Sequence, residues 1–165
     1  MYSINDEPLE VVVADMLKTQ NKTIALAESC TGGMITSQLV SVPGISSNLV
    51  AGLVTYSNES KIKQLGVKSA TLEKFGAVSD ETAREMAEGL YKVTGADIAL
   101  SVTGIAGPDG GSEEKPKGLV YIALKHQDSI ESFQLKLTGN RQRIRTLATL
   151  NALDIIRKYL KKVGT

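Results

Sequence analysis

The stretch T-I-A-L-A-E-S-C-T-G-G-M-I-T, residues 23–36, joins a short apolar run to a polar, glycine-rich turn. Residues 23–27 are apolar and partly β-branched, which is typical of a buried strand. Residues 31–42 have the pattern of a helix that ends before Pro43-Gly44. A strand that leads directly into a helix indicates an α/β unit, with the turn at the carboxyl end of the strand.

The rest of the chain repeats this alternation of strands and helices. The patterns predict a helix to Thr19 capped by Asn5 or Asp6, a strand at 49–56, a helix at 58–65, a turn or short helix at 73–76, a helix from Ser79 or Asp80 to Gly95, strands at 96–103, 119–125 and 129–137, and a helix from Asn140 to about Lys162. We therefore expect one domain, residues 1–165, with an α/β three-layer sandwich: a mainly parallel sheet, helices on both faces and a late antiparallel hairpin.

The composition excludes several classes of function. Net charge is only +1, so no nucleic-acid partner is expected. No apolar run is long enough to cross a bilayer and the start of the chain lacks the features of a signal peptide, so we expect a cytoplasmic protein without a membrane partner. One cysteine and one histidine cannot form a disulfide or a clustered zinc site, and no metal site is predicted.

Two adjacent side chains in the first turn are candidate nucleophiles. Ser29 lies between the strand and the helix, where free backbone N–H groups and the helix dipole can hold an oxyanion. The alternative is that Ser29 or Thr31 only caps the helix. Cys30 has no neighbouring thiol or imidazole to activate it, and we interpret it as a buried packing residue.

A base for Ser29 is expected from the segment T-Y-S-N-E-S-K, residues 55–61. The only histidine, His126, falls in the predicted hairpin turn, which argues against a Ser-His-Asp triad. Lys61 falls in the first turn of a predicted helix, where the dipole lowers the pKa of an amine, and Tyr56 could relay a proton. The alternative for Lys61 is an ordinary solvated lysine.

The segment S-V-T-G-I-A-G-P-D-G-G-S, residues 101–112, follows the third parallel strand and is rich in glycine. It matches neither a Walker loop nor a dinucleotide fingerprint, but its turns can expose N–H groups to an anion. The ligand candidates here are Thr103, Gly104, Ala106 and Gly107. Arginines at 141, 143 and 145 begin the last helix and require an anionic partner, although spacing does not show which one points inward.

Four motifs together resemble the CinA C-terminal domain family. They are A-E-S-C-T-G-G at 27–33, V-T-Y-S-N-E-S-K at 54–61, G-A-V-S at 76–79 and S-V-T-G-I-A-G-P-D-G-G-S-E-E-K-P-K-G at 101–118. The resemblance covers nearly the whole chain. Its stand-alone members include amidases that convert nicotinamide mononucleotide to nicotinate mononucleotide and ammonia, so it implies a small nucleotide substrate, no cofactor and a homo-oligomer.

The resemblance also implies roles for individual residues. Ser29 takes the place of the family's nucleophile, and Tyr56 and Lys61 match its tyrosine and lysine. For the oxyanion we expect N–H groups of Thr31, Gly32 and Gly33, and for the phosphate the loop 103–107 with Arg145. The alternatives are a non-catalytic nucleotide-binding or regulatory module linked to competence or DNA damage, and a phosphohydrolase that uses the glycine loop.

Overall fold

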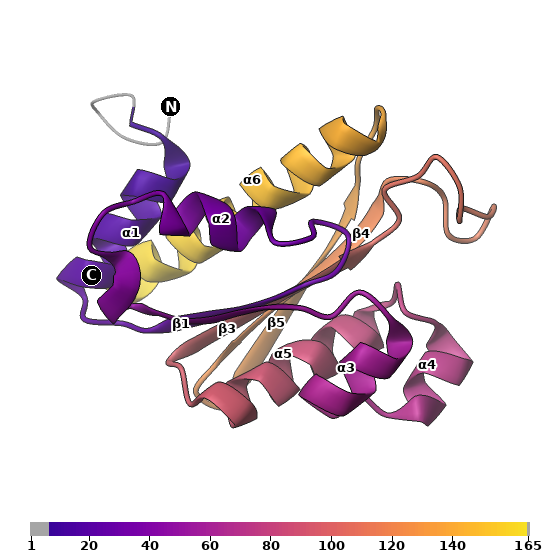
Figure 1. Ribbon diagram of the computed structural model, residues 1–165, viewed down its shortest axis with the longest axis horizontal. Coiled ribbons are helices and arrows are strands. Elements are labelled where there is room, and N and C mark those ends of the chain that lie inside the picture. Colours follow the sequence, from indigo (N-terminus) through magenta and orange to yellow (C-terminus); the bar gives the residue numbers. More distant parts are fainter. Residues whose placement is uncertain (1–6, 165) are drawn as a thin grey trace.

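Within residues 7–164, which the computed structural model describes, a five-stranded sheet lies between two layers of helices (Figure 1). The strands are β1 (Ile24–Glu28), β2 (Leu49–Val54), β3 (Ile98–Gly104), β4 (Leu119–His126) and β5 (Ser129–Lys136). Their order in the sheet is β2-β1-β3-β4-β5. β1 pairs in parallel with β2 and β3, whereas β4 pairs antiparallel with β3 and β5. The predicted α/β class, with its late antiparallel hairpin, is confirmed.

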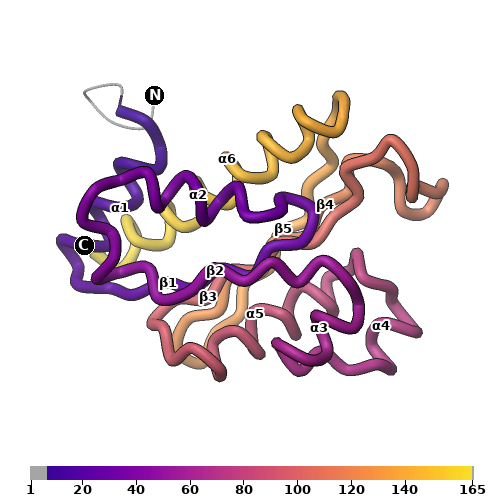
Figure 2. Tube along the Cα trace, in the orientation of Figure 1, coloured from indigo at the N-terminus to yellow at the C-terminus, as the bar shows by residue number. Residues whose placement is uncertain are grey.

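Two groups of helices cover the two faces of the sheet. The helices are α1 (Leu9–Thr19), α2 (Met34–Val40), η1 (Ile45–Ser47), α3 (Asn58–Leu65), α4 (Ser69–Phe75), α5 (Asp80–Thr94) and α6 (Arg141–Val163). Helices α1, α2 and α6 lie on one face, and α3, α4 and α5 lie on the other, as the tube in Figure 2 also shows. The helical layers on both faces are those that the alternation predicts.

The two faces are packed with side chains of different size. On β1, Ile24 and Leu26 face the α1, α2 and α6 layer, whereas Ala25 and Ala27 face α5. The small side chains let α5 approach the sheet closely. Helix α5 also packs closely against α3, because a Cβ atom at Gly89 would lie 1.7 Å from the carbonyl oxygen of Leu65, the last residue of α3.

Polar side chains fix the starts of three helices where the sequence predicts them. Ser57 accepts a hydrogen bond from the N–H of Ser60 and begins α3, and Ser79, rather than Asp80, begins α5 in the same way. Asn140 accepts from the N–H of Arg143 and begins α6. The predicted caps of α1, Asn5 and Asp6, lie outside the described residues, and the described helix begins at Leu9.

Two helices differ from the prediction. Helix α4 starts at Ser69 instead of near Glu73, because Glu85 of α5 accepts hydrogen bonds from the N–H of Lys68 and the hydroxyl of Thr71. Helix α2 starts at Met34 instead of Thr31, since Gly32 and Gly33 have left-handed backbone angles, with φ of 62° and 95°. The turn after β1 is therefore longer than expected.

Helix α6 is 23 residues long and crosses the sheet on the face that it shares with α1 and α2. Its N-terminal end lies near the turn after β1, because Arg145 hydrogen-bonds to that turn. In the part of the chain that the structure describes, no helix combines the length and the apolar character needed to cross a membrane.

Candidate active site

A cleft of about 250 Å³ opens where the parallel strands end. Its lining residues are Ser29, Cys30, Tyr56, Lys61, Ala77, Val78, Thr103, Gly104, Ile105, Ala106, Gly107, Asp109, Gly110 and Arg141. They come from the turn after β1, the segment from Tyr56 to Lys61 after β2, the end of β3 with the loop that follows it, the residues before α5 and the first residue of α6. The three candidate segments of the sequence therefore meet at the carboxyl ends of the parallel strands.

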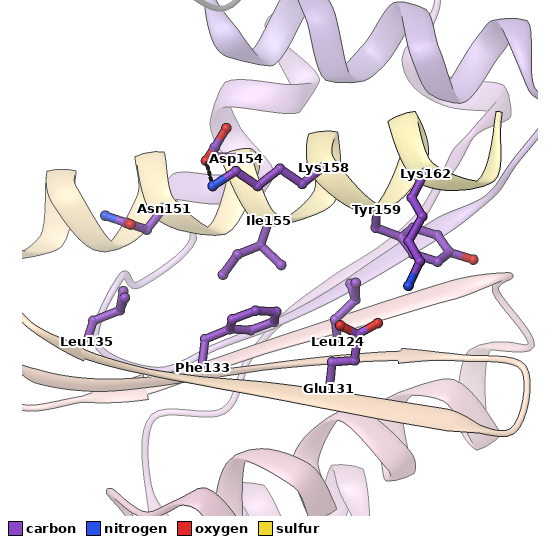
Figure 3. Close-up of a pocket in the computed structure, with 10 residues that line it drawn as sticks. All are labelled: Leu124, Glu131, Phe133, Leu135, Asn151, Asp154, Ile155, Lys158, Tyr159 and Lys162. Atoms are coloured by element: carbon purple, nitrogen blue, oxygen red, sulfur yellow. Dashed lines mark ion pairs between the residues drawn. The ribbon is translucent and has the colours of Figure 1, made fainter. Parts of the chain in front are cut away.

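A second cavity, of about 320 Å³, lies between α6 and the β4–β5 hairpin (Figure 3). Leu124, Phe133 and Ile155 point into it. Of its two acidic residues, Asp154 pairs with Arg157 and Lys158, and Glu131 contacts His126. No serine or cysteine lines this cavity. The chemistry-bearing residues thus gather in the smaller cleft.

Ser29 and Lys61 meet inside the cleft. The Nζ atom of Lys61 lies 3.3 Å from Oγ of Ser29, and it also donates to the carbonyl oxygens of Thr55, at 2.8 Å, and Tyr56, at 3.2 Å. The Lys61 side chain is fully buried, and this burial lowers the pKa of its amine from the usual 10.5. The solvated-lysine alternative is therefore wrong, and Lys61 is placed to accept a proton from Ser29.

The backbone holds both partners of this pair in place. The N–H of Ser29 donates to the carbonyl oxygen of Val102, which ties the residue to the end of β3. Lys61 lies in the first turn of α3, and its own N–H donates to the carbonyl oxygen of Ser57. Strand β1 and helix α3 thus bring the hydroxyl and the amine together from opposite sides.

Tyr56 contacts Lys61 and Arg141, which both line the cleft. Its carbonyl oxygen accepts from Lys61, and its hydroxyl accepts from Nη2 of Arg141 at 3.1 Å. The residue is 60% exposed. In the described structure Tyr56 contacts Lys61 through its backbone, and the hydrogen bond that its phenol makes is to Arg141.

Glu28, the last residue of β1, has a role that the sequence analysis missed. It is fully buried, and its Oε2 atom accepts hydrogen bonds from the hydroxyl of Thr31 and the N–H groups of Gly33 and Ile35. Its Oε1 atom accepts from the N–H and the hydroxyl of Thr36. Glu28 therefore caps α2, in place of the predicted Ser29 or Thr31. The signal in the sequence was a glutamate at the end of an otherwise apolar strand, which indicates a buried carboxylate with hydrogen-bond donors around it.

The N–H groups of the two glycines in the turn are not available for an oxyanion. Gly32 donates to the carbonyl oxygen of Ser29 at 3.0 Å, and Gly33 donates to Glu28 at 3.0 Å. Thr31 is fully buried and does not line the cleft. The expected oxyanion role of Gly32 and Gly33 is wrong, and their positive φ angles explain why glycines are needed there.

Cys30 is packed in the core, as predicted. The residue is 5% exposed and belongs to the apolar cluster between the sheet and α6. Burial raises the pKa of its thiol to about 11, although the N–H groups of Cys30 and Thr31 partly oppose this. At neutral pH the thiol is protonated, which leaves Ser29 as the candidate nucleophile in this turn.

The predicted ligand loop lies where expected, but the predicted arginine does not. Thr103, Gly104, Ala106 and Gly107 all line the cleft, and the Thr103 hydroxyl donates to the carbonyl oxygen of Ala77.

Arg145 lies outside the cleft. Its guanidinium donates to the carbonyl oxygens of Cys30, at 3.1 Å, and Thr31, at 2.9 Å, so it supports the turn from behind. The arginine that lines the cleft is Arg141. The expectation that Arg145 faces the ligand site is therefore wrong, because Arg145 bonds to the turn after β1 while Arg141 faces the cleft.

The only histidine is remote from the cleft. His126 pairs with Ile98 at the start of β3, whereas Gly104, which lines the cleft, is at the other end of that strand. Its ring packs against Tyr159, with the ring centroids 4.3 Å apart. Across residues 7–164, no three His, Cys, Asp or Glu side chains are grouped closely enough to hold a metal ion.

Comparison with known proteins agrees with these motifs and this fold. The model of the CinA C-terminal domain matches residues 6–160. A relative from Acetivibrio thermocellus, whose name describes a competence-damage inducible protein, is 58% identical over 163 residues, which are 99% of this chain and 40% of the relative. A CinA-like protein from Thermotoga maritima is 51% identical over 98% of this chain and 39% of its own length. The chain thus spans about two fifths of the curated relatives that it matches.

Two solved structures have the same fold along almost their full length. A CinA superfamily protein from Klebsiella pneumoniae has a TM-score of 0.90 and 32% identity, covering 93% of this chain and 96% of that one. The competence/damage inducible protein CihA from Agrobacterium tumefaciens has a TM-score of 0.87 and 37% identity, covering 94% and 97%. The chain belongs to the CinA C-terminal domain family.

Proposed function

We propose that this protein is an amidohydrolase that converts nicotinamide mononucleotide to nicotinate mononucleotide and ammonia, with Ser29 as nucleophile and Lys61 as base. The observation that carries the proposal is the fully buried Lys61 amine, 3.3 Å from the Ser29 hydroxyl, inside a cleft at the ends of the parallel strands. A serine needs a base to become a nucleophile, and a lysine can act as one only when it is neutral. Burial favours the neutral amine.

The reaction proceeds by acyl transfer. Lys61 takes the hydroxyl proton of Ser29 as Oγ forms a bond to the carboxamide carbon of the substrate. Lys61 then gives this proton to the amide nitrogen, the C–N bond breaks, and ammonia leaves. Water attacks the ester on Ser29 while Lys61 accepts one of its protons. The bond to Oγ breaks, Ser29 regains a proton, and the carboxylic acid is released.

The electrostatic environment suits this sequence of proton transfers. The three oxygens that Lys61 Nζ contacts are all uncharged, so no adjacent carboxylate holds the amine in its protonated form. The two carbonyl oxygens, of Thr55 and Tyr56, keep the amine directed at Ser29. When the amine is protonated during the reaction, these same carbonyls stabilise the cation.

The test is a measurement of ammonia release from nicotinamide mononucleotide by the purified protein and two pairs of variants. In the first pair, Ser29→Ala removes the nucleophile and Cys30→Ala removes the adjacent thiol. In the second pair, Lys61→Met removes the base, while Lys63→Met removes an exposed amine two residues along the same helix. We expect Ser29→Ala and Lys61→Met to lower kcat by at least about 10³-fold, and both controls to keep activity close to that of the unchanged protein.

Two results would contradict the proposal. If the unchanged protein binds nicotinamide mononucleotide in calorimetry but releases no ammonia, the protein is a non-catalytic nucleotide-binding module. If Ser29→Ala retains the full rate, another group performs the attack. A parallel assay for inorganic phosphate detects the phosphohydrolase alternative in the same samples.

A further inference from the structure

Arg141 links two walls of the cleft. It is the first residue of α6, and its Nη1 atom donates to the carbonyl oxygen of Gly107 at 2.6 Å. Its Nη2 atom donates to the hydroxyl of Tyr56 at 3.1 Å. These bonds use two of the five N–H donors of the guanidinium. Arg141 is exposed as well as cleft-lining, so a ligand can reach its other donors.

Among the cleft-lining residues, Arg141 is the one that presents a permanent positive charge. The other lysine, arginine, aspartate and glutamate side chains that line the cleft are Lys61, which burial drives toward the neutral form, and Asp109. The acceptors of Arg141 are uncharged oxygens, and none of the ion pairs within residues 7–164 includes it. A phosphate oxygen is a stronger acceptor for a guanidinium than a carbonyl or a phenol.

Tyr56 contacts both Arg141 and Lys61. The backbone of Tyr56 contacts Lys61, and the far end of its side chain contacts Arg141. Tyr56 thus connects Arg141 to the lysine that contacts Ser29, and all four side chains line one cleft. In nicotinamide mononucleotide the phosphate is separated from the carboxamide by the pyridinium ring and the ribose. Because Ser29 and Arg141 line the same cleft, a substrate with its carboxamide at Ser29 can place its phosphate at Arg141.

We propose that Arg141 binds the phosphate of the substrate and makes the enzyme prefer the nucleotide over the nucleoside. This inference rests on the proposed amidase function. Arg141 is a specificity-determining residue in this arrangement: it exchanges its bond to the Tyr56 hydroxyl for bonds to phosphate oxygens, while Ser29 and Lys61 act on the carboxamide.

The experiment compares ammonia release from nicotinamide mononucleotide and from nicotinamide riboside, which lacks the phosphate. For each substrate, kcat/KM is measured for the unchanged protein, Arg141→Gln and Arg141→Lys. Arg143→Gln is the matched control, because Arg143 is on the same helix, is exposed and does not line the cleft. We expect Arg141→Gln to lower kcat/KM for the nucleotide by about 10- to 100-fold and to leave the riboside nearly unaffected. Arg141→Lys should recover part of the preference, and Arg143→Gln should keep all of it.

The possible failures are distinguishable. If Arg141→Gln lowers kcat/KM for both substrates by the same factor, Arg141 only shapes the cleft and the inference is wrong. The inference is also wrong if the unchanged protein uses both substrates equally well. If no ammonia is released from either substrate, the amidase proposal fails, and calorimetric titration with nicotinamide mononucleotide then decides on Arg141. Weaker binding to Arg141→Gln than to Arg143→Gln supports a phosphate contact, and equal binding refutes it.

Discussion

Replacing Glu28 with glutamine tests whether this carboxylate holds the turn that carries Ser29. The Glu28 carboxylate accepts all five of its hydrogen bonds, three of them from backbone N–H groups and two from hydroxyls. A glutamine amide has one oxygen and one NH₂ group. If the oxygen replaces Oε2, the NH₂ group faces the N–H of Thr36, which then loses its acceptor. The Thr36 hydroxyl can rotate to accept from the amide.

The magnitude follows from these contacts. One partly buried N–H without an acceptor costs about 1–3 kcal/mol, and the remaining bonds lose the strengthening that the negative charge provides. The glutamine gains something in return, because it has no charge to desolvate. We expect Glu28→Gln to lower the free energy of unfolding by about 2–4 kcal/mol.

The assay is urea unfolding followed by circular dichroism, with kcat measured on the same preparations. Glu114→Gln is the control, since Glu114 is exposed in the loop before β4 and should change stability by less than about 0.5 kcal/mol. A loss of kcat should accompany the loss of stability for Glu28→Gln, because the same bonds position Ser29. If Glu28→Gln unfolds at the same urea concentration as the unchanged protein, the argument that this carboxylate organises the turn is refuted.

Three further predictions concern single residues. Because burial lowers the pKa of Lys61 from 10.5 and only the neutral amine accepts a proton, kcat/KM for deamidation should rise with pH and level off below pH 10.5; a rate that falls as Lys61 loses its proton would contradict its role as base. With a thiol pKa of about 11, only about a thousandth of Cys30 is ionised at pH 8. A thiol reagent should therefore label the folded protein much more slowly than the urea-unfolded protein, and equal labelling rates would show that the thiol is accessible. Gly89→Ala should lower the free energy of unfolding by about 3 kcal/mol, because the added Cβ would overlap the Leu65 carbonyl oxygen. The control Val93→Ala, at a 61% exposed position of the same helix, should lower it by less than about 0.5 kcal/mol. Thermal unfolding of both variants is the measurement, and similar midpoints would disprove the close packing.

The convergence of Ser29 and Lys61 could be predicted from the sequence because it depends on topology. Both residues follow parallel strands, and parallel strands end at the same edge of a sheet whatever the details of packing. The capping residues Ser57, Ser79 and Asn140 were also predictable, since each acts on the backbone three residues ahead.

The features that were missed depend on contacts between distant segments. Arg141 and Arg145 are four residues apart on one helix, so they lie on the same face and no periodicity separates them. The difference arises only from what each guanidinium reaches: Gly107 and Tyr56 for Arg141, and the turn after β1 for Arg145.

The role of Glu28 was hidden for a related reason. A strand residue rarely caps the helix that follows it, and only the left-handed glycines of this turn bring the start of α2 back to its carboxylate. Helix α4 likewise gains its first turn from Glu85, a residue on another helix. Neither interaction follows a local spacing rule.

The cleft has two walls of different construction, and this affects how its specificity can change. Ser29 follows β1 and Lys61 lies in α3, after β2; the N–H of Ser29 is bonded to Val102 of β3, and the N–H of Lys61 to Ser57 at the start of α3. The opposite wall is the loop of residues 105–111, which a single side chain, Arg141, joins to α6. Loops tolerate substitution better than the strands that carry them. Selection can therefore alter the loop while Ser29 and Lys61 stay where they are, so the wall that faces a ligand and the proposed acylating pair can change independently in this fold.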